Sequence, residues 1–437
     1  MKKISLGLIG FGTIGTGVIR LLQENGALIA GRLGAELVLK RIADIDLERS
    51  RGVQVDASLL TRDASEILND PEIDIVVELM GGYEPARTLI LSALRQGKHV
   101  VTANKALLAT HGNELFLNAM RQGVNIGFEA SVGGTIPIIK TVRESLIGNR
   151  VLSLSAILNG TANFILSKMT DERKPFAAVL KEAQELGYAE ADPVYDVEGI
   201  DAAHKLAILL SLAYGKKVRL EDLYREGISE VSEQDIEFSR ELGYRIKLLA
   251  IAIRRGEEIE ARLHPTMIPF DHLLANVNGN FNAFHLVADA ADSIFLYGQG
   301  AGMMPTASAV VCDIVDIARD LLKGITVRIP PRVLDEEHIE EIRLMPFEEI
   351  RTNYYFRFSA VDRPGVLSRI SGILGGHDIS IATVIQKGRK EEGGAVPIVM
   401  TTYKSRERDV RRAMEEIDRL DVVMGKTRLI RIEDERL

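Results

Sequence analysis

Five carboxylates crowd the twelve residues from Glu190 to Asp201. Asp201 stands four residues before Lys205, so on a helix both side chains would share one face. Oxidation of an alcohol needs a group that takes a proton while hydride leaves, and a lysine with a lowered pKa can do this. Asp201 would hold the ammonium in place, and the other carboxylates would suit a cationic substrate such as an amino acid's ammonium. Spacing alone favours a plainer interpretation, an exposed ion pair worth about 0.3–0.5 kcal/mol.

A glycine pattern near the N-terminus indicates a dinucleotide site. It matches G-x-G-x-x-G directly after a predicted strand and at the start of a predicted helix. Gly10 would allow the tight turn, Gly12 the approach of backbone to a pyrophosphate, and Gly15 close helix–strand packing. The helix N-terminus would offer N–H groups and partial positive charge to the phosphates, whereas the alternative is a glycine-rich turn without a ligand. The predicted cofactor-binding residues are Gly10, Phe11, Gly12, Thr13, Ile14 and Gly15.

Asp44 ends the second predicted strand and is expected to contact the adenosine ribose. Its carboxylate could accept hydrogen bonds from the ribose hydroxyls, which favours NAD, and it would repel a 2′-phosphate. Arg49 and Arg51 are close in sequence and could favour NADP instead. Asp44 lies 29 positions beyond Gly15, and a loop at 30–35 is expected to absorb the extra length. The sequence favours NAD and leaves the use of both cofactors open.

The elements that must position these residues alternate between strand and helix up to about residue 129. Near-continuous apolar strands with amphipathic helices between them indicate a parallel sheet covered on both faces. Ligands lie beyond the carboxyl ends of such strands, so Lys105 could reach cofactor or substrate, although a lysine there is more often only solvated. Strands are predicted at Ile4–Gly10, Glu36–Ala43, Ile75–Leu79, His99–Thr102 and Asn125–Phe128, and helices at Ile14–Glu24 and Arg87–Gln96.

Two further regions follow this α/β domain at 1–130. A mixed α+β domain is predicted at 131–325, and two prolines and an acidic stretch at 335–341 mark a linker within 326–350. Residues 351–437 show the order β-α-β-β-α-β, which is ferredoxin-like, with a hairpin loop at 387–394. Predicted elements of the middle domain are Leu152–Leu158, Phe176–Leu186, Ile200–Tyr214, Gly256–His264 and Ser293–Tyr297; those of the last domain are Tyr354–Val361, Gly365–Leu374, Ile379–Gln386, Ala395–Thr402, Glu407–Leu420 and Val422–Ile432.

The composition argues against several classes of protein. A net charge of −8 over 437 residues and the absence of tryptophan argue against a nucleic-acid partner. No apolar run approaches the roughly 20 residues of a membrane span, and the basic start before a short apolar run indicates a first strand rather than a signal peptide. Cys312 is the single cysteine, so nothing indicates an oxidising compartment, and the cytoplasm is the expected location.

Several motifs in a fixed order resemble the homoserine dehydrogenase family. The stretch from Gly187 to Leu206 resembles its signature, and the match extends over about residues 3–320. The resemblance implies reversible, NAD(P)-dependent interconversion of aspartate 4-semialdehyde and homoserine, on the route to threonine, methionine and isoleucine. Further matching segments are 102–105, 129–137, 158–163, 264–266, 298–302 and 304–306.

The resemblance also implies roles for single residues. Lys205 is expected to donate and accept the proton, Asp201 to support the reacting oxygen, and Lys105 to contact substrate or cofactor. Glu190 is expected to bind the substrate, and Asp196 to assist through the substrate's ammonium.

A monovalent cation, expected to be sodium, is also implied. Hard cations prefer oxygen ligands, and a glycine turn can expose carbonyls. A second glycine-rich turn with Gly302 is expected near the nicotinamide, and Met303 stands where family members often have another glycine. The expected cation ligands are the carboxylate of Glu129 and the backbone carbonyls of Val132, Gly134 and Ile136.

The C-terminal region resembles an ACT domain, with Asp362–Leu367 as its strand-to-helix turn. ACT domains often pair and bind amino acids between them, so threonine, an end product of the pathway, is the expected effector. The alternative is an oligomerisation module without a ligand. A homodimer through the middle domain is expected, and ACT pairing would extend it to a homotetramer.

Three other functions fit the sequence less well. An aldehyde dehydrogenase using a thiol would need an activated cysteine, but Cys312 lies in 307–321, which is predicted to be a buried helix. A hydroxy-acid dehydrogenase would need a catalytic histidine, and helical spacing puts His204 off the face that carries Lys205. A sensor without activity would have no reason to retain the carboxylates and the lysine together.

Overall fold

The computed structural model describes residues 2–331, 340–387 and 395–434. The chain forms two compact units, and each is assembled from three separate segments. The first unit comprises Met1–Leu152, Asp201–Leu223 and Phe281–Ile342; the second comprises Ser153–Ile200, Tyr224–Asn280 and Arg343–Leu437. No helix among the described residues is long and apolar enough to cross a membrane.

The first unit is built on a six-stranded sheet in the order β3-β2-β1-β4-β5-β6, and every neighbouring pair is parallel. The predicted parallel sheet is therefore confirmed. The order in which the chain adds strands to the sheet changes direction between β1 and β4. Ligands of such sheets bind at this point. The strands are β1 Lys2–Ile9, β2 Ala35–Ala43, β3 Leu60–Thr61, β4 Ile75–Glu78, β5 His99–Thr102 and β6 Ile126–Gly127.

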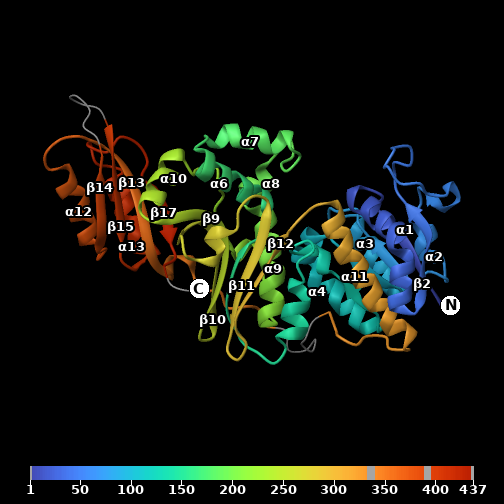
Figure 1. The fold of residues 1–437 in the computed structure, drawn as a ribbon. Helices are drawn as coiled ribbons and strands as arrows, with labels where there is room; N and C mark the ends of the chain where they lie inside the picture. The colour runs from blue at the N-terminus through green and yellow to red at the C-terminus, as the bar shows by residue number, and fades with distance from the viewer. Residues whose placement is uncertain (1, 332–339, 388–394, 435–437) are drawn as a thin grey trace. The chain divides into compact units, whose positions relative to one another are not determined.

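Helices cover this sheet. Since crossovers between parallel strands are right-handed, the change of direction places α1 on one face and α3 and α4 on the other. α1 packs against α11 in one apolar cluster, and α3 contacts α4 (Figure 1). The bounds are α1 Thr13–Leu33, α3 Ala86–Arg95, α4 Lys105–Gln122 and α11 Met303–Leu322.

Two predictions about these helices were wrong. α1 was expected to end at Glu24 before a loop at 30–35, but it continues to Leu33 because Ile29 and Leu33 extend its apolar face onto the sheet. Gly34, at φ +77°, then ends the helix, and its N–H donates to the carbonyl of Ala30 at 2.8 Å. Cys312 lies on the predicted helix but is exposed, because it shares the polar face of α11 with Asp316 and Arg319.

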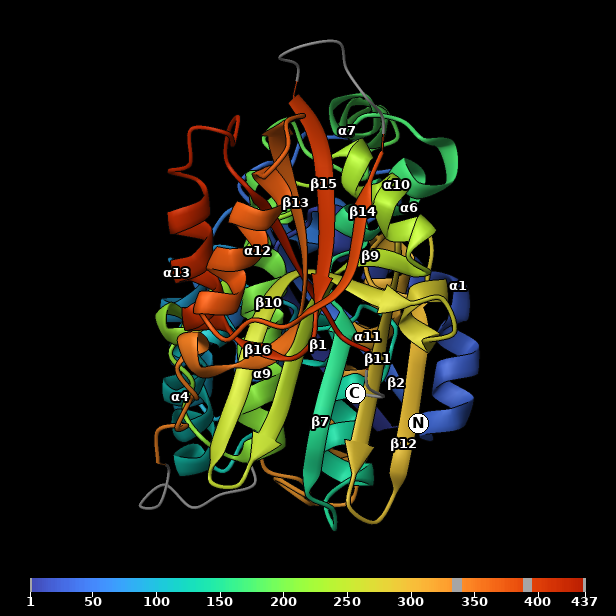
Figure 2. The same ribbon diagram turned by 90° about the vertical axis from the view of Figure 1, so that its left-hand side faces the viewer.

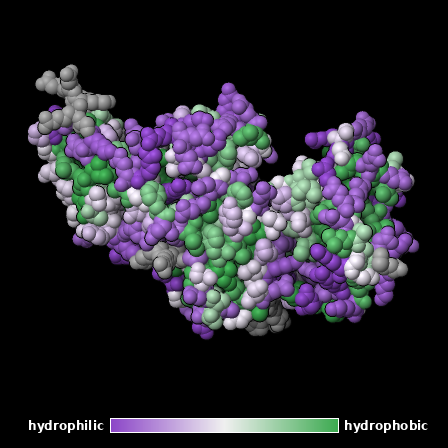
Figure 3. Space-filling model, in the orientation of Figure 1, coloured by the Kyte–Doolittle hydropathy of each residue, from purple (hydrophilic) through white to green (hydrophobic). Residues whose placement is uncertain are grey.

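The first unit also contains helix α9, Ile200–Tyr214, and the antiparallel hairpin of β11, Phe281–Ala288, and β12, Asp292–Gln299. On the hairpin, the Tyr297 ring is 53% exposed and stacks on Phe281 with ring centroids 5.0 Å apart. Hydrophobic residues gather on the visible face in the region of β11 (Figure 3). Tyr297 on β12 is therefore the exposed aromatic residue of the hairpin, whereas β11 is almost entirely buried.

In the second unit the strands follow the order β7-β9-β10-β17-β13-β15-β14. β17 pairs in parallel with β10 and antiparallel with β13, so it joins the middle region to the C-terminal one (Figure 1). The first part of this unit contains β7 Val151–Ile157, β8 Tyr224–Arg225, β9 Tyr244–Arg255, β10 Glu258–Pro269, α6 Gly160–Glu172, α7 Phe176–Glu185, α8 Val194–Val197 and α10 Glu233–Glu241.

The C-terminal region has the predicted β-α-β-β-α-β order. Its strands form the antiparallel run β17-β13-β15-β14, and α12 and α13 contact each other in the apolar cluster that covers it (Figure 2). The expected hairpin loop at 387–394 and the acidic stretch at 335–341 lie almost entirely outside the described residues. The bounds are β13 Arg351–Val361, α12 Val366–Gly376, β14 Ile381–Gln386, β15 Ala395–Thr402, α13 Glu407–Ile417 and β17 Arg428–Ile432.

Candidate active site

Lys205, Asp201 and Lys105 form one ion cluster in the first unit. The two oxygens of the Asp201 carboxylate lie 2.7 Å from the Lys205 Nζ and 2.8 Å from the Lys105 Nζ. Asp201 and Lys205 are one turn apart on α9, and Lys105 is the first residue of α4. Two helices far apart in the sequence thus bring two ammonium groups to one carboxylate.

The cluster is buried on the α9 side and open on the α4 side. The side chains of Asp201 and Lys205 are 5% and 8% exposed, whereas that of Lys105 is 38% exposed. The plainer interpretation, an exposed ion pair, therefore does not hold. Burial alone would raise the pKa of Asp201, but the charges of Lys205 and Lys105 outweigh it and hold that pKa well below its usual range.

The turn after β5 positions Lys105. The Asn104 side chain caps α4 by accepting a first-turn N–H at 3.2 Å, and it donates to the Gly82 carbonyl at 2.7 Å. The Thr102 hydroxyl accepts the Asn104 N–H at 3.0 Å and donates to the Glu78 carboxylate at 2.6 Å. The start of α4 is thereby fixed to the ends of two neighbouring strands.

Glu78 is a residue that the sequence analysis missed. It is fully buried at the end of β4 and accepts the N–H groups of Met80 and Gly81 at 2.8 and 3.3 Å. Burial raises its pKa. The available signal was a carboxylate that ends an otherwise apolar strand, at the edge of the sheet where ligands bind.

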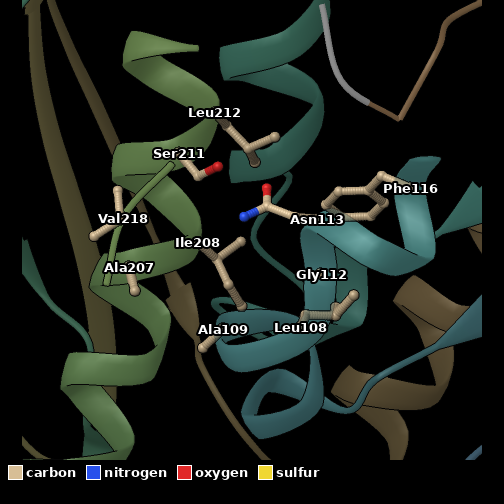
Figure 4. Close-up of a pocket in the computed structure, with 10 residues that line it drawn as sticks. All are labelled: Leu108, Ala109, Gly112, Asn113, Phe116, Ala207, Ile208, Ser211, Leu212 and Val218. Carbon is tan, nitrogen blue, oxygen red and sulfur yellow. The ribbon is translucent and has the colours of Figure 1, made fainter. Parts of the chain in front are cut away.

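Packing between α4 and α9 keeps the two lysines together. Residues 201–210 of α9 are all buried. Farther along the helices, a small cavity of about 20 Å³ lies between them, lined by side chains that include Leu108, Phe116 and Ile208 (Figure 4). The helices therefore line one cavity with apolar side chains and the polar Asn113 and Ser211, and the charged cluster lies toward one end of it.

The glycine fingerprint has two crowded positions and one open one. Gly10 has φ +101°, and a Cβ on it would lie 2.6 Å from the carbonyl carbon of Leu79. A Cβ on Gly15 would lie 2.2 Å from the Gly10 carbonyl oxygen, but one on Gly12 would meet nothing within 4 Å. The space over Gly12, at the N-terminus of α1, could accommodate the pyrophosphate of a dinucleotide.

Asp44 lies directly beside this turn. Its carboxylate accepts the N–H of Phe11 and, at 2.8 Å, the N–H of Asp46. The Arg51 guanidinium is 3.6 Å from the Asp44 carboxylate and 4.5 Å from the centre of the Phe11 ring. An acceptor for ribose hydroxyls and a cation suited to a 2′-phosphate thus occupy the same place.

Gly302 and Met303 begin α11. Gly302, at φ +118°, caps the helix. A Cβ on Gly17 would lie 2.8 Å from the Met303 Cγ, so the methionine side chain packs against α1. The departure from glycine at position 303 therefore contributes to helix packing.

Glu190 and Asp196 belong to the second unit. Asp196 lies on the short helix α8 and accepts a hydrogen bond at 2.7 Å from the side chain of Asn159, which also caps α6. The Thr161 hydroxyl donates to the Tyr188 carbonyl at 2.7 Å, and Glu190 is exposed. The Asn-Gly-Thr motif thus supports the carboxylate-rich loop.

Glu129 is buried near the end of the parallel sheet. Its two oxygens accept the N–H groups of Ile139 and Lys140, both at 2.9 Å, and its own N–H donates to Asp313 at 2.8 Å. Burial, together with the charge of Asp313, raises its pKa to about 8. A cation beside this carboxylate would favour its charged form, so the residue fits the expected cation site.

Comparison with protein families covers nearly the whole chain. A family model described as homoserine dehydrogenase matches residues 137–315, and one described as homoserine dehydrogenase, NAD binding domain, matches 10–129. An ACT domain model matches 354–422.

Individual proteins agree with these models. A homoserine dehydrogenase of Pseudomonas aeruginosa is 44% identical over 435 residues, covering 99% of both chains, and one of Bacillus subtilis is 38% identical with the same coverage. The crystal structure of a homoserine dehydrogenase from Thiobacillus denitrificans has a TM-score of 0.93 at 47% identity and covers 99% of both chains. A hyperthermophilic archaeal homoserine dehydrogenase mutant, solved with NADPH, has a TM-score of 0.63 at 28% identity, covering 75% of this chain and 100% of its own.

Proposed function

The chain belongs to the homoserine dehydrogenase family, NAD(P)-dependent oxidoreductases acting on a CH–OH group, and from that premise we propose that Lys205 is its proton-transfer residue. The supporting observation is the buried cluster in which Asp201 holds the ammonium groups of Lys205 and Lys105 at 2.7 and 2.8 Å. The reaction interconverts homoserine and aspartate 4-semialdehyde.

In the oxidation, a C–H bond of the carbinol carbon breaks and its hydride leaves, while the hydroxyl loses a proton and the C=O bond forms. The nicotinamide dinucleotide, when bound, supplies the hydride acceptor. The amine of Lys205 takes the hydroxyl proton, and in the reduction its ammonium returns a proton to the aldehyde oxygen. Asp201 supports the reacting oxygen indirectly, by holding the ammonium groups of both lysines in place. Lys105 stabilises the negative charge that develops on the reacting oxygen.

We propose that Glu190 binds the substrate and that Asp196 pairs with the substrate's ammonium. The family resemblance and the density of carboxylates in this loop support both roles. The Asn159 side chain holds the Asp196 carboxylate at 2.7 Å, and the exposure of Glu190 makes its carboxylate accessible to a ligand.

We propose that the fingerprint residues 10–15, with Gly302, bind the dinucleotide, and that Asp44 favours NAD while Arg51 permits NADP. The open space at Gly12 and the adjacency of Asp44 to Arg51 support this. An Asp44→Ser variant is expected to shift the ratio of kcat/KM values toward NADP.

We propose sodium as the cation, bound by Glu129 and the carbonyls of Val132, Gly134 and Ile136. The buried carboxylate and the turn at Gly133 and Gly134, with φ +75° and +56°, support it.

We propose threonine as the effector of the ACT domain, and a homodimer through the middle domain that ACT pairing extends to a tetramer. The exposed Tyr297 ring on β12 supports the dimer. We also propose that the protein acts in the cytoplasm. The proposed domain limits are 1–130, 131–325, 326–350 and 351–437.

The test is oxidation of L-homoserine at alkaline pH, with NAD and NADP separately and sodium present. Lys205→Ala is expected to lower kcat by about 10²–10⁴-fold, the usual contribution of general base catalysis. The matched control is Lys181→Ala, because Lys181 also pairs with a carboxylate four residues away but is 77% exposed. Full activity of a folded Lys205→Ala variant would show that Lys205 does not transfer the proton.

A further inference from the structure

Residues 224–229, the coupling segment, lie between the ACT domain and the loop that carries Asp196, all within the second unit. Tyr224 and Arg225 form β8, which pairs in parallel with β10. The Glu226 N–H donates to the Leu263 carbonyl at 2.8 Å. The backbone of the segment is thereby attached to the middle sheet.

Arg431 of the ACT strand β17 holds one end of the segment. It is 1% exposed, and its guanidinium donates to the Glu226 carboxylate at 2.9 Å and to the buried Glu407 at 2.6 and 2.9 Å. The Tyr224 hydroxyl donates to Glu226 at 2.9 Å, and its ring stacks on Phe347. The Arg431–Glu407 pair is buried and costly to break, and the Glu226 carboxylate, which is 36% exposed, joins the segment to it.

The other end of the segment contacts the loop directly. The Ile228 N–H donates to the Val197 carbonyl at 2.8 Å, and the Ser229 hydroxyl donates to the Glu198 carboxylate at 2.6 Å. A Cβ on Gly227 would lie 2.5 Å from the Val197 carbonyl oxygen. The two backbones are therefore in contact, and a shift of the segment must move Val197.

We propose that the coupling segment transmits changes in the position of the ACT domain to the substrate-binding loop Asp196–Glu198. Tyr224 and Ser229 act as positioning residues for this loop. This inference rests on the proposed substrate role of Asp196, which directly precedes Val197 in the chain. A cavity of about 690 Å³, lined in part by Glu226 and Arg431, lies beside the segment.

The test uses the full-length enzyme. Ser229→Ala removes the bond to Glu198, Tyr224→Phe removes the hydroxyl that holds Glu226, and Ser229→Thr keeps a hydroxyl. Ser229→Ala and Tyr224→Phe are expected to raise KM for homoserine about threefold to tenfold, the size of one lost hydrogen bond, with kcat and the cofactor KM unchanged. Hydrogen exchange of residues 194–199 should become faster in both, and Ser229→Thr should restore the wild-type values.

Matched controls are Ser368→Ala and Tyr403→Phe, which change exposed residues of the ACT domain away from the segment. The Asp196→Asn variant distinguishes the proposed substrate role of Asp196 from the proposed coupling through the segment. If it raises KM while the segment variants change neither KM nor exchange, the coupling is wrong and the role of Asp196 stands. If it leaves KM unchanged, the role of Asp196 fails and the coupling to substrate fails with it.

Discussion

Asp201 faces ammonium groups from two helices, and this arrangement governs how the site responds to pH. The two ammonium groups hold its pKa well below the usual range, so the carboxylate is charged at neutral and alkaline pH. A carboxylate at 2.7 Å favours the ammonium form of Lys205. Oxidation, which needs the amine, should therefore be fastest at alkaline pH, and reduction should extend to lower pH.

Asp201→Asn tests this relation. The amide keeps most of the side chain's shape but removes the counter-charge, so the amine form of Lys205 is reached more easily. The acidic limb of the pH profile of kcat for oxidation is expected to move to lower pH, while the maximal rate falls about tenfold or more because the lysines are less well fixed. A maximal rate that falls with no movement of the limb would contradict the electrostatic coupling.

Sequence reasoning found most of the residues in this cluster but not their full arrangement. Spacing of four residues on a helix brings Asp201 and Lys205 together, and the end of a parallel strand indicates Lys105. The second contact, between Lys105 and Asp201, depends on how α4 and α9 pack, which no local pattern contains. Glu78 had a local signal, a carboxylate at the end of an apolar strand, but its complete burial follows from its strand neighbours.

The turn into α1 offers a comparison between two glycines of one element. Gly12→Ala introduces a methyl group where no atom lies within 4 Å, so stability should be kept, while the affinity for NADPH should fall about tenfold or more because the pyrophosphate needs that space. Gly15→Ala brings its Cβ to 2.2 Å from the Gly10 carbonyl oxygen, so the midpoint of thermal unfolding should fall.

Calorimetry and fluorescence titration of NADPH check both variants. Gly31→Ala, on the exposed surface of α1 with nothing within 4 Å of its Cβ, is the control and should change neither property adversely. A Gly12→Ala protein that binds NADPH normally would show that the fingerprint does not hold the phosphates as proposed.

Among the elements, those with a regular apolar period were predicted well and the irregular ones were not. The parallel strands and the six elements of the ACT domain follow the predicted order. Strand β9 was missed because basic residues, Arg245 and Lys247, interrupt its apolar run, although Lys247 is buried in the fold. Helix α6 was missed because it starts at a glycine, with Asn159 as its cap.

Lys247 affects the stability of the molecule as a whole. Its Nζ donates to the Val277 carbonyl at 2.6 Å and to the Asn163 side chain at 3.0 Å, which joins β9 to α6. Burial, with a smaller effect of Arg245, lowers its pKa to about 7, against about 10.4 in the unfolded chain. Between these values the unfolded chain binds more protons, so the free energy of unfolding rises with pH.

Lys247→Met removes this contribution. Between pH 7 and 10, the free energy of unfolding of the wild-type protein is expected to rise by roughly 1 kcal/mol per pH unit relative to that of the variant. Urea unfolding at each pH measures this difference. Lys181→Met, at an exposed position, should parallel the wild type throughout. Parallel curves for Lys247→Met as well would show that Lys247 is not neutralised by folding.

Strand β17 lies between β10 and β13 in space but follows both of them in the sequence. During translation, β10 and β13 are therefore made first, and the stretches that pair with β17, Thr266–Met267 of β10 and Asn353–Arg357 of β13, lack that partner until the ribosome has supplied it. Unpaired strand edges promote association with other chains. A nascent chain of this protein must then be protected over that interval, and a message truncated before residue 428 would yield a product prone to aggregation.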